Sequence, residues 1–209
     1  MNKPVIYTVG HSTHTPEYFG ELLKAYAVTC VVDVRSVPAS RYNPQYNQRA
    51  LADFLKNNDI AYLHFAKEFG ARQTDINVLD NGRVNFEKVR NSPIFKQGVE
   101  RIRTGVDKGY TIALMCAESD PFDCHRFSMV SVGLKEAAFD VQHIFKDKSV
   151  KTNAELEQEL LKKYEDKLPK SNMFNPNVSK SERLNEAYRL KNKEIGFSPY
   201  KQDEEDRYE

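Results

Sequence analysis

The sequence contains few cysteines, no long hydrophobic run and almost no net charge. Its 3 cysteines in 209 residues are an odd number, which argues against a disulfide framework and favours a reducing compartment such as the cytoplasm. No apolar run approaches the ~20 residues of a membrane-spanning helix, and the first residues lack the apolar stretch of a secretion signal. The formal net charge of +1 argues against a generally basic nucleic-acid-binding surface, although it allows a local basic patch.

The rest of the composition is typical of a globular domain. Hydrophobic residues make up 40% of the chain and charged residues 29%. The length suits one domain with an extension rather than two full domains.

Apolar segments and amphipathic helical patterns alternate along the first part of the chain. Thr15 and Pro16 are typical of the first turn of a helix. Five segments read as strands: residues 5–9, 28–34, 60–65, 110–116 and 141–145. Helical patterns lie between them, over residues 15–26, 48–57, 86–108 and 123–138. The alternation predicts an α/β fold of three layers, with a mostly parallel five-stranded sheet and helices on both faces.

The composition changes near residue 150. Residues 152–167 predict a strongly charged helix, and a further helix is expected near residues 181–193. Acidic residues crowd positions 203–206. We therefore expect an α/β core domain over residues 1–150 and a helical, charged extension with a loose acidic end over residues 151–209.

Polar motifs follow four of the predicted strands. They are Gly10-His11-Ser12, the segment from Asp33 to Asn47, His64 with the residues beyond it, and Cys116-Ala117-Glu118 followed by Cys124-His125-Arg126. In open α/β sheets ligands bind at the carboxyl ends of the strands. The motifs are therefore expected to form one site, although they lie far apart in the sequence.

Taken together and in this order, these motifs resemble the uncharacterised family catalogued as domain of unknown function 488. The resemblance covers roughly residues 5–145 and leaves out the tail after Lys151. It implies a compact α/β domain found in bacterial-type proteins, with no settled activity. Labels tied to DNA repair occur among the relatives.

The segment after the second strand favours anion binding. Arg35, Arg41 and Arg49 occur with no acidic residue between Asp33 and Asp53. The planar guanidinium group suits phosphate or carboxylate oxygens. The alternative is a solvated loop with one structural ion pair, between Asp33 and either Arg35 or Arg126.

The predicted site has catalytic and ligand-binding residues. Glu118 and His11 are the acid–base candidates, and Cys116 is a candidate thiolate at a strand end. The ligand-binding candidates are Ser12, Arg35, Ser36, Arg41, Asn43, His125 and Arg126. Glu118 could instead pair with an arginine and hold the loops.

The cysteines also have structural interpretations. The phosphatase pattern needs arginine six positions after its cysteine, where this chain has Phe122. Cys116 could be a small buried hydrophobic residue, as Cys30 is expected to be, and His143 is expected to be structural. No metal or other cofactor is expected, because the close pairing of ligands in structural zinc sites is missing and Cys124 and His125 should point to different sides of a helix. A metal site remains the less favoured alternative.

The sequence therefore predicts an enzyme, a hydrolase or transferase, that binds a phosphate-bearing ligand such as a nucleotide or a nucleic-acid end. The alternatives are a non-catalytic nucleotide or nucleic-acid binding module, and a thiol- or metal-dependent enzyme that uses Cys116 and Cys124. The expected partner is a small phosphate-bearing molecule or a nucleic acid, and not a membrane.

Overall fold

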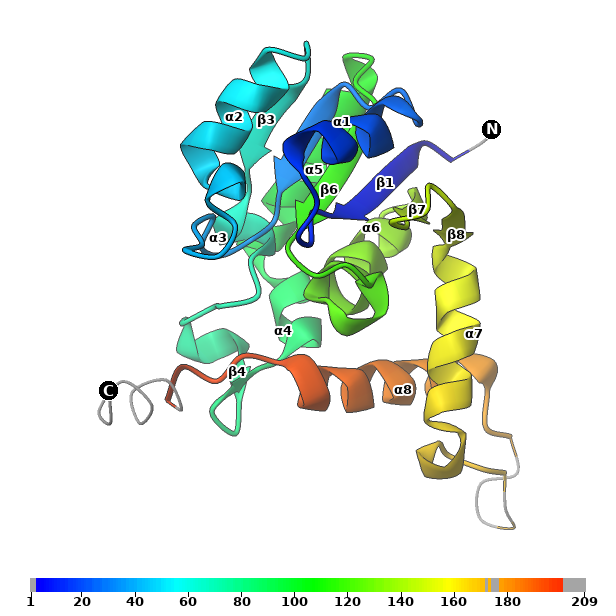
Figure 1. The fold of residues 1–209 in the computed structure, drawn as a ribbon. Coiled ribbons are helices and arrows are strands. Elements are labelled where there is room, and N and C mark those ends of the chain that lie inside the picture. Colours follow the sequence, from blue (N-terminus) through cyan, green and yellow to red (C-terminus); the bar gives the residue numbers. More distant parts are fainter. Residues whose placement is uncertain (1–2, 172, 174–176, 201–209) are drawn as a thin grey trace.

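A six-stranded sheet forms the centre of the protein (Figure 1). The computed structural model describes residues 3–171, 173 and 177–200. The strands of the main sheet are β1 (Val5–Gly10), β2 (Cys30–Asp33), β3 (Ala61–His64), β6 (Ile112–Cys116), β7 (Asp140–Ile144) and β8 (Val150–Thr152). Their order across the sheet is β3-β2-β6-β1-β7-β8.

The five strands predicted from the sequence are confirmed, and all neighbouring pairs among them are parallel. Strand β8 was not predicted, and it pairs antiparallel with β7 at the edge of the sheet. This strand is short and half-buried, so it lacks the continuous apolar run of the central strands.

Helices cover both faces of the sheet, as predicted. Helices α1 (Pro16–Lys24) and α2 (Gln48–Lys56) pack on one face against alternate strand residues such as Val31 and Met115. Helices α4 (Phe86–Asn91), α5 (Pro93–Asp107) and α6 (Val132–Glu136) cover the other face. Successive side chains of a strand point to opposite faces, so Cys116 lies on the α5–α6 side.

Shorter elements complete the core domain. Helix α3 (Ala66–Phe69) follows β3, and a small hairpin is formed by β4 (Leu79–Asp80) and β5 (Arg83–Val84). Single 3₁₀ turns are formed by Pro44–Tyr46, Ile76–Val78, Pro121–Asp123 and Glu165–Lys167, and Arg126–Ser131 is π-helical. The turn at Pro121–Asp123 and the π-helical segment bring the last polar motif to the end of β6.

The N-terminus of α1 has the predicted cap. The hydroxyl of Thr15 accepts a hydrogen bond from the backbone N–H of Tyr18, and Pro16 occupies the first turn. The cap fixes where the chain turns from the loop after β1 into the helix. The same loop carries His11 and Ser12.

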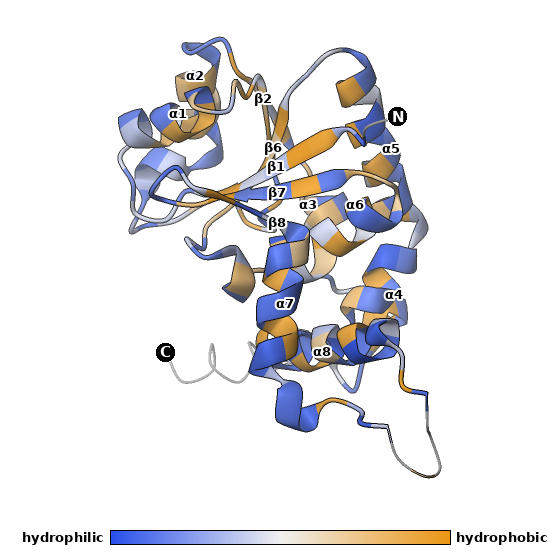
Figure 2. Ribbon diagram, turned by 90° about the vertical axis from the view of Figure 1, so that its right-hand side faces the viewer, coloured by the Kyte–Doolittle hydropathy of each residue, from blue (hydrophilic) through white to orange (hydrophobic). Residues whose placement is uncertain are grey.

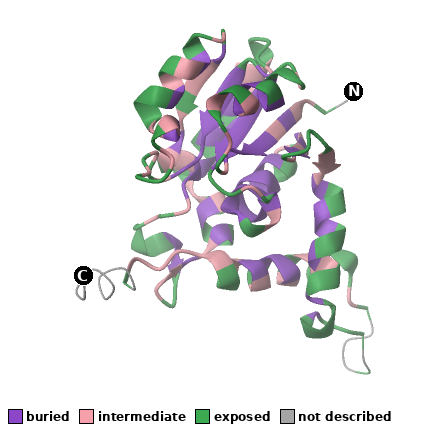
Figure 3. Ribbon diagram, viewed as in Figure 1, coloured by how far each residue is buried: buried purple, intermediate pink, exposed green. Residues whose placement is uncertain are grey.

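The described part of the C-terminal extension contains the helices α7 (Asn153–Lys163) and α8 (Lys180–Ile195), and it packs on the core. Leu156 and Leu160 of α7 and Tyr188 of α8 share a buried cluster with Phe127 of the π-helical segment. Figure 2 shows the mixed hydropathy of both helices, and Figure 3 shows that the outer side of α7 is exposed. The acidic positions 203–206 lie outside the described residues, and the division of the chain near residue 150 stays a prediction.

No helix within the described residues combines the length and the apolar character needed to cross a membrane.

Candidate functional site

The polar motifs that follow the parallel strands lie together at one edge of the sheet. The backbone N–H of His11, just after β1, donates to the carbonyl of Cys116 at the end of β6 (2.9 Å). Gly10 allows this close approach, because a Cβ atom there would overlap the carbonyl oxygen of Glu118. His64, at the end of β3, contacts the carbonyl oxygen of Arg35 through Nε2 (2.9 Å).

Arg35 directs its guanidinium group back onto the end of its own strand. Its Nε and Nη2 atoms donate to the two carboxylate oxygens of Asp33 (2.9 and 2.6 Å). Nη2 also donates to the carbonyl of Tyr46 (2.8 Å), and Nη1 lies 3.2 Å from Nε2 of His11. The hydroxyl of Tyr62 donates to the same carboxylate (2.9 Å). Every guanidinium nitrogen of Arg35 thus has a partner inside the protein, an arrangement that orders the strand ends.

His11 is buried as a neutral ring. Its Nδ1 donates to the carbonyl of Ser12 (2.8 Å), so Nε2 is the acceptor for Arg35. The ring stacks on Tyr46 with the centroids 4.1 Å apart. Burial lowers the pKa of His11 to about 4. Both ring nitrogens have partners, so the predicted acid–base role of His11 stays a prediction, and its contacts indicate a scaffold role.

The predicted ligand-binding residues of the adjoining loops have unequal surroundings. The hydroxyl of Ser36 accepts from the backbone N–H of Arg72 (2.8 Å), and the backbone N–H of Asn43 donates to the hydroxyl of Ser40 (3.1 Å). Ser12 takes a left-handed conformation (φ 48°) and contributes its backbone. Arg41 is exposed, beside the exposed Tyr42. Arg41 is therefore the predicted anion-binding arginine whose side chain faces solvent.

Two thiols and an imidazole meet at the end of β6. The Nδ1 atom of His125 lies 3.9 Å from Sγ of Cys116 and 3.7 Å from Sγ of Cys124. All three ligand atoms lie within 4.8 Å of one another, and all three side chains are buried. We call these residues the Cys116–Cys124–His125 cluster.

The backbone explains why Cys124 and His125 share this cluster. The prediction that they point to different sides of a helix is wrong, because Cys124 is extended (φ −123°, ψ 145°) and precedes the helical segment. Nε2 of His125 lies 3.2 Å from the carbonyl oxygen of Val34, to which it can only donate. That hydrogen bond leaves Nδ1 of a neutral ring with its lone pair toward the two sulfurs.

Glu118 and Arg126 border the cluster. Oε2 of Glu118 lies 3.0 Å from Sγ of Cys124, and the Glu118 residue reaches the surface. Arg126 is fully buried, and its Nη1 and Nη2 atoms donate to the carbonyls of Glu118 and Ser119 (2.7 and 3.0 Å). The backbone N–H of Arg126 also points at Sγ of Cys124 (3.4 Å). Arg126 therefore holds the loop after β6 and brings positive charge to the thiols.

The charges around the cluster set its protonation. The contact with Cys124, together with burial, raises the pKa of the Cys116 thiol well above its ordinary value. Burial alone would raise the pKa of Cys124, but the contact with Cys116 and the charge of Arg126 hold it well below that value. Burial raises the pKa of Glu118, and the neighbouring Cys124 adds to this effect. The pKa of His125, which burial alone would lower, is raised by Cys124. Because Oε2 of Glu118 lies 3.0 Å from Sγ of Cys124, the arrangement favours a thiolate at Cys124 only when Glu118 carries the proton.

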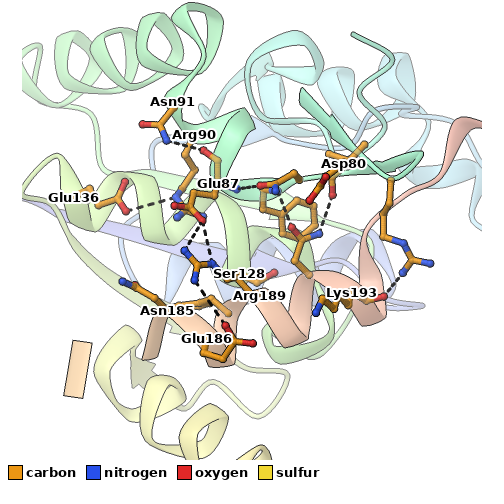
Figure 4. Close-up of a pocket in the computed structure, with 16 residues that line it drawn as sticks. Asp80, Glu87, Arg90, Asn91, Ser128, Glu136, Asn185, Glu186, Arg189 and Lys193 are labelled. Atoms are coloured by element: carbon orange, nitrogen blue, oxygen red, sulfur yellow. Dashed lines mark hydrogen bonds and ion pairs between the residues drawn. The ribbon is translucent and has the colours of Figure 1, made fainter. Parts of the chain in front are cut away.

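A polar pocket of about 530 Å³ lies elsewhere, between α4, the β4–β5 hairpin and α8 (Figure 4). Its wall contains ion pairs between Arg189 and Glu87 (3.3 Å) and between Arg90 and Glu136 (3.6 Å). Acidic and basic side chains alternate around it, so the pocket does not select a ligand of one charge. No motif in the sequence pointed to it.

The structure places Glu118, Cys116, His125 and Arg126 together, and places His11 and Arg35 beside them in a separate hydrogen-bonded network. The favoured set of site residues left out Cys124, which only the thiol or metal alternative used, and no alternative included Tyr46 or Tyr62. The sequence held one signal for Cys124, since a cysteine and a histidine stand side by side at the start of a helical segment. Tyr46 and Tyr62 gave no signal, because their roles depend on contacts between strands.

Comparison with known proteins gives one match. A family model described as "Domain of unknown function DUF488" matches residues 15–132, more than half of the chain. No curated protein and no solved structure matches.

Proposed function

The chain belongs to the DUF488 family, and we propose that it is a metal-dependent hydrolase whose Cys116–Cys124–His125 cluster binds a divalent transition-metal ion, with zinc as the first candidate. The observation that carries the proposal is the convergence of three buried ligand atoms within 4.8 Å. The sequence alone did not favour a metal site, because the spacing of these ligands along the chain does not indicate one. The fold brings the three ligand atoms together.

The two nitrogen–sulfur distances within the cluster are close to those around a tetrahedral ion. Zinc–sulfur bonds of about 2.3 Å and zinc–nitrogen bonds of about 2.0–2.1 Å place tetrahedral ligand atoms roughly 3.5–3.8 Å apart. The separations from Nδ1 of His125 to the two sulfurs are 3.9 and 3.7 Å. The hydrogen bond from His125 to Val34 is the outer contact that metal-bound histidines typically make.

Three protein ligands leave a fourth position for water, as in catalytic zinc sites. A bound zinc ion would lower the pKa of that water to about 7. Glu118 lies beside Cys124 and reaches the surface, so its carboxylate would take the proton of the water. The water oxygen would then bond to the electrophilic atom of the substrate as the bond to the leaving group breaks, and Glu118 would pass the proton to the leaving group. Some zinc deaminases likewise use a glutamate that is not a ligand for proton transfer.

A phosphate-bearing ligand, a nucleotide or a nucleic-acid end, is the substrate class that we propose. The support is Arg41, which is exposed in the loop that leaves the same edge of the sheet. Arg35 and Arg126 do not add to it, since all guanidinium nitrogens of Arg35 and both Nη atoms of Arg126 bind protein groups. A reducing compartment, the cytoplasm, would keep both thiols available as ligands, and all three cysteines are free.

A thiol enzyme with Cys124 as its nucleophile is the second candidate. The lowered pKa of Cys124 favours it. The Cys124 side chain is only 1% exposed, and this burial restricts substrate access to a nucleophilic Cys124 and to a metal ion in the cluster alike, so burial does not separate the two candidates. The two candidates differ in their response to alkylation: zinc would protect the cluster from iodoacetamide, whereas a nucleophilic Cys124 would be alkylated and inactivated.

The test uses the full chain loaded with zinc. We expect one zinc per chain, at least about a hundredfold weaker binding in C124S, and unchanged binding in C30S, whose cysteine is buried at the start of β2, outside the cluster. Hydrolysis of a panel of nucleotides and phosphate esters should require zinc and should fall at least about a hundredfold in E118Q. Equal zinc binding by C124S and C30S would overturn the metal site. Full activity in E118Q would remove Glu118 from the mechanism.

A further inference from the structure

Lys191 of α8 is a buried lysine with an unusual partner. Its side chain is 1% exposed, and its Nζ atom donates to Oδ1 of Asp123 (2.8 Å). Nζ also lies 3.7 Å from Glu194 and 4.8 Å from the centre of the Phe122 ring. A buried ammonium group is unfavourable unless it is paired, so these contacts fix where Lys191 lies.

Asp123 directly precedes two members of the Cys116–Cys124–His125 cluster. It closes the 3₁₀ turn Pro121–Asp123, in which the N–H of Cys124 donates to the carbonyl of Pro121 (3.1 Å). The turn is anchored at its start by the carboxylate of Asp120, which accepts from the N–H of Phe122 (2.8 Å). Its other end is anchored by Lys191.

The loop after β6 is therefore held from two directions. Arg126 holds Glu118 and Ser119 from inside the core domain, and Lys191 holds Asp123 from the extension. Aromatic contacts reinforce the second anchor, because Phe122 stacks on Phe127 (5.7 Å between centroids) and Phe127 contacts Tyr188 of α8 (5.6 Å).

We infer that Lys191 is a positioning residue for the metal site: it holds Asp123 and thereby places Cys124 and His125 for metal binding. This inference rests on the proposed function. It also extends the site beyond the part of the chain that matches the family model, residues 15–132. The helix α8 would then act in metal binding and not only in burying apolar surface.

The experiment compares K191M, K191R and K163M in the full chain by titration with Co²⁺, followed by the absorption of the bound ion. Lys163 is the matched control, because it also lies in the extension and also contacts Phe122 and Glu194, but it is 39% exposed and does not hold Asp123. We expect Co²⁺ to bind about tenfold more weakly to K191M, with an altered absorption spectrum, because outer contacts typically change metal affinity by about 10–100-fold. K191R should recover the spectrum and most of the affinity, and K163M should match the parent protein.

A second readout uses the metal-free protein and does not depend on the proposed function. The rate at which a thiol reagent labels Cys124 should rise several-fold in K191M and should stay at the parent rate in K163M. If K191M does not fold, D123A takes its place, since the Asp123 side chain is 68% exposed and its removal leaves no cavity. Parent-like Co²⁺ affinity, spectrum and labelling in these variants would overturn the role of Lys191. Failure of the parent protein to bind Co²⁺ would overturn the proposed function, and the labelling rates would then decide for or against the anchor.

Discussion

The Nε2 atom of His125 lies 3.2 Å from the carbonyl oxygen of Val34, the residue that follows β2. This contact joins the polar motif after β6 to the end of the neighbouring strand. It also sets the ring so that Nδ1 faces Cys116 and Cys124. The parallel sheet thus contributes to the site through the orientation of one imidazole as well as through the position of its strand ends.

Arg35 should matter for stability more than for anion binding. Replacing it in R35M leaves the carboxylate of Asp33 buried without its cation, which should lower the free energy of unfolding by about 3–5 kcal/mol. Denaturant unfolding followed by circular dichroism measures this change. The exposed Arg49 provides the matched variant R49M, which should stay within about 0.5 kcal/mol of the parent protein. An R35M variant as stable as R49M would contradict the structural role of Arg35.

The strands and the shared site could be predicted from the sequence, but the direction of the Arg35 side chain could not. The five parallel strands were predictable, because each is a short apolar run and four of them end in a polar motif. The convergence of these motifs followed from the rule for strand ends. Residues two apart on an extended segment point to the same face, so the sequence allows Arg35 to reach Asp33 but does not say that the guanidinium folds back onto this carboxylate. The sequence therefore did not decide whether Arg35 binds an anionic ligand or Asp33.

The same limit applies to Cys124 and His125. In a helix, adjacent side chains point about 100° apart. Cys124 has an extended backbone, so this rule does not apply to Cys124 and His125. The hairpin β4–β5 and the strand β8 were missed because strands of two or three residues leave no periodic pattern.

His143 should make stability depend on pH. The ring is fully buried, with Nδ1 accepting from Thr8 (2.8 Å) and Nε2 donating to Asn153 (3.2 Å), and burial lowers its pKa to about 3. Because the pKa of His143 is lower in the folded chain, the unfolded chain takes up the proton first as the pH falls. The stabilisation is therefore complete above pH 6.5 and is lost as the pH falls toward 3.

Between pH 7 and pH 5 this histidine should lower the free energy of unfolding by about 2 kcal/mol. Urea unfolding at both pH values measures the difference, and H143Q should reduce it, although H143Q is less stable at pH 7. The same pH dependence in H143Q would assign the effect to other groups.

The extension should contribute to the stability of the core domain. The change of composition near residue 150 predicts that truncation after residue 167 leaves the core fold intact. Tyr188 of α8, however, is 7% exposed and contacts the buried Phe127. Y188A should therefore lower the free energy of unfolding by about 3–5 kcal/mol, and truncation after residue 167 by at least as much. Y42A removes a tyrosine that is 95% exposed and should have almost no effect. Thermal unfolding of the three variants measures these effects. A truncated chain with the parent melting temperature would show that the extension does not stabilise the core domain.

X-ray absorption at the zinc edge of the zinc-loaded full chain would show the ligands of the proposed metal site. We expect two sulfur ligands at about 2.3 Å and nitrogen or oxygen ligands at about 2.0–2.1 Å, with one sulfur lost in C116S. C30S should give the parent spectrum, because Cys30 lies outside the cluster. Zinc that washes out of the folded protein, or a spectrum with only nitrogen and oxygen ligands, would rule out metal binding by the Cys116–Cys124–His125 cluster.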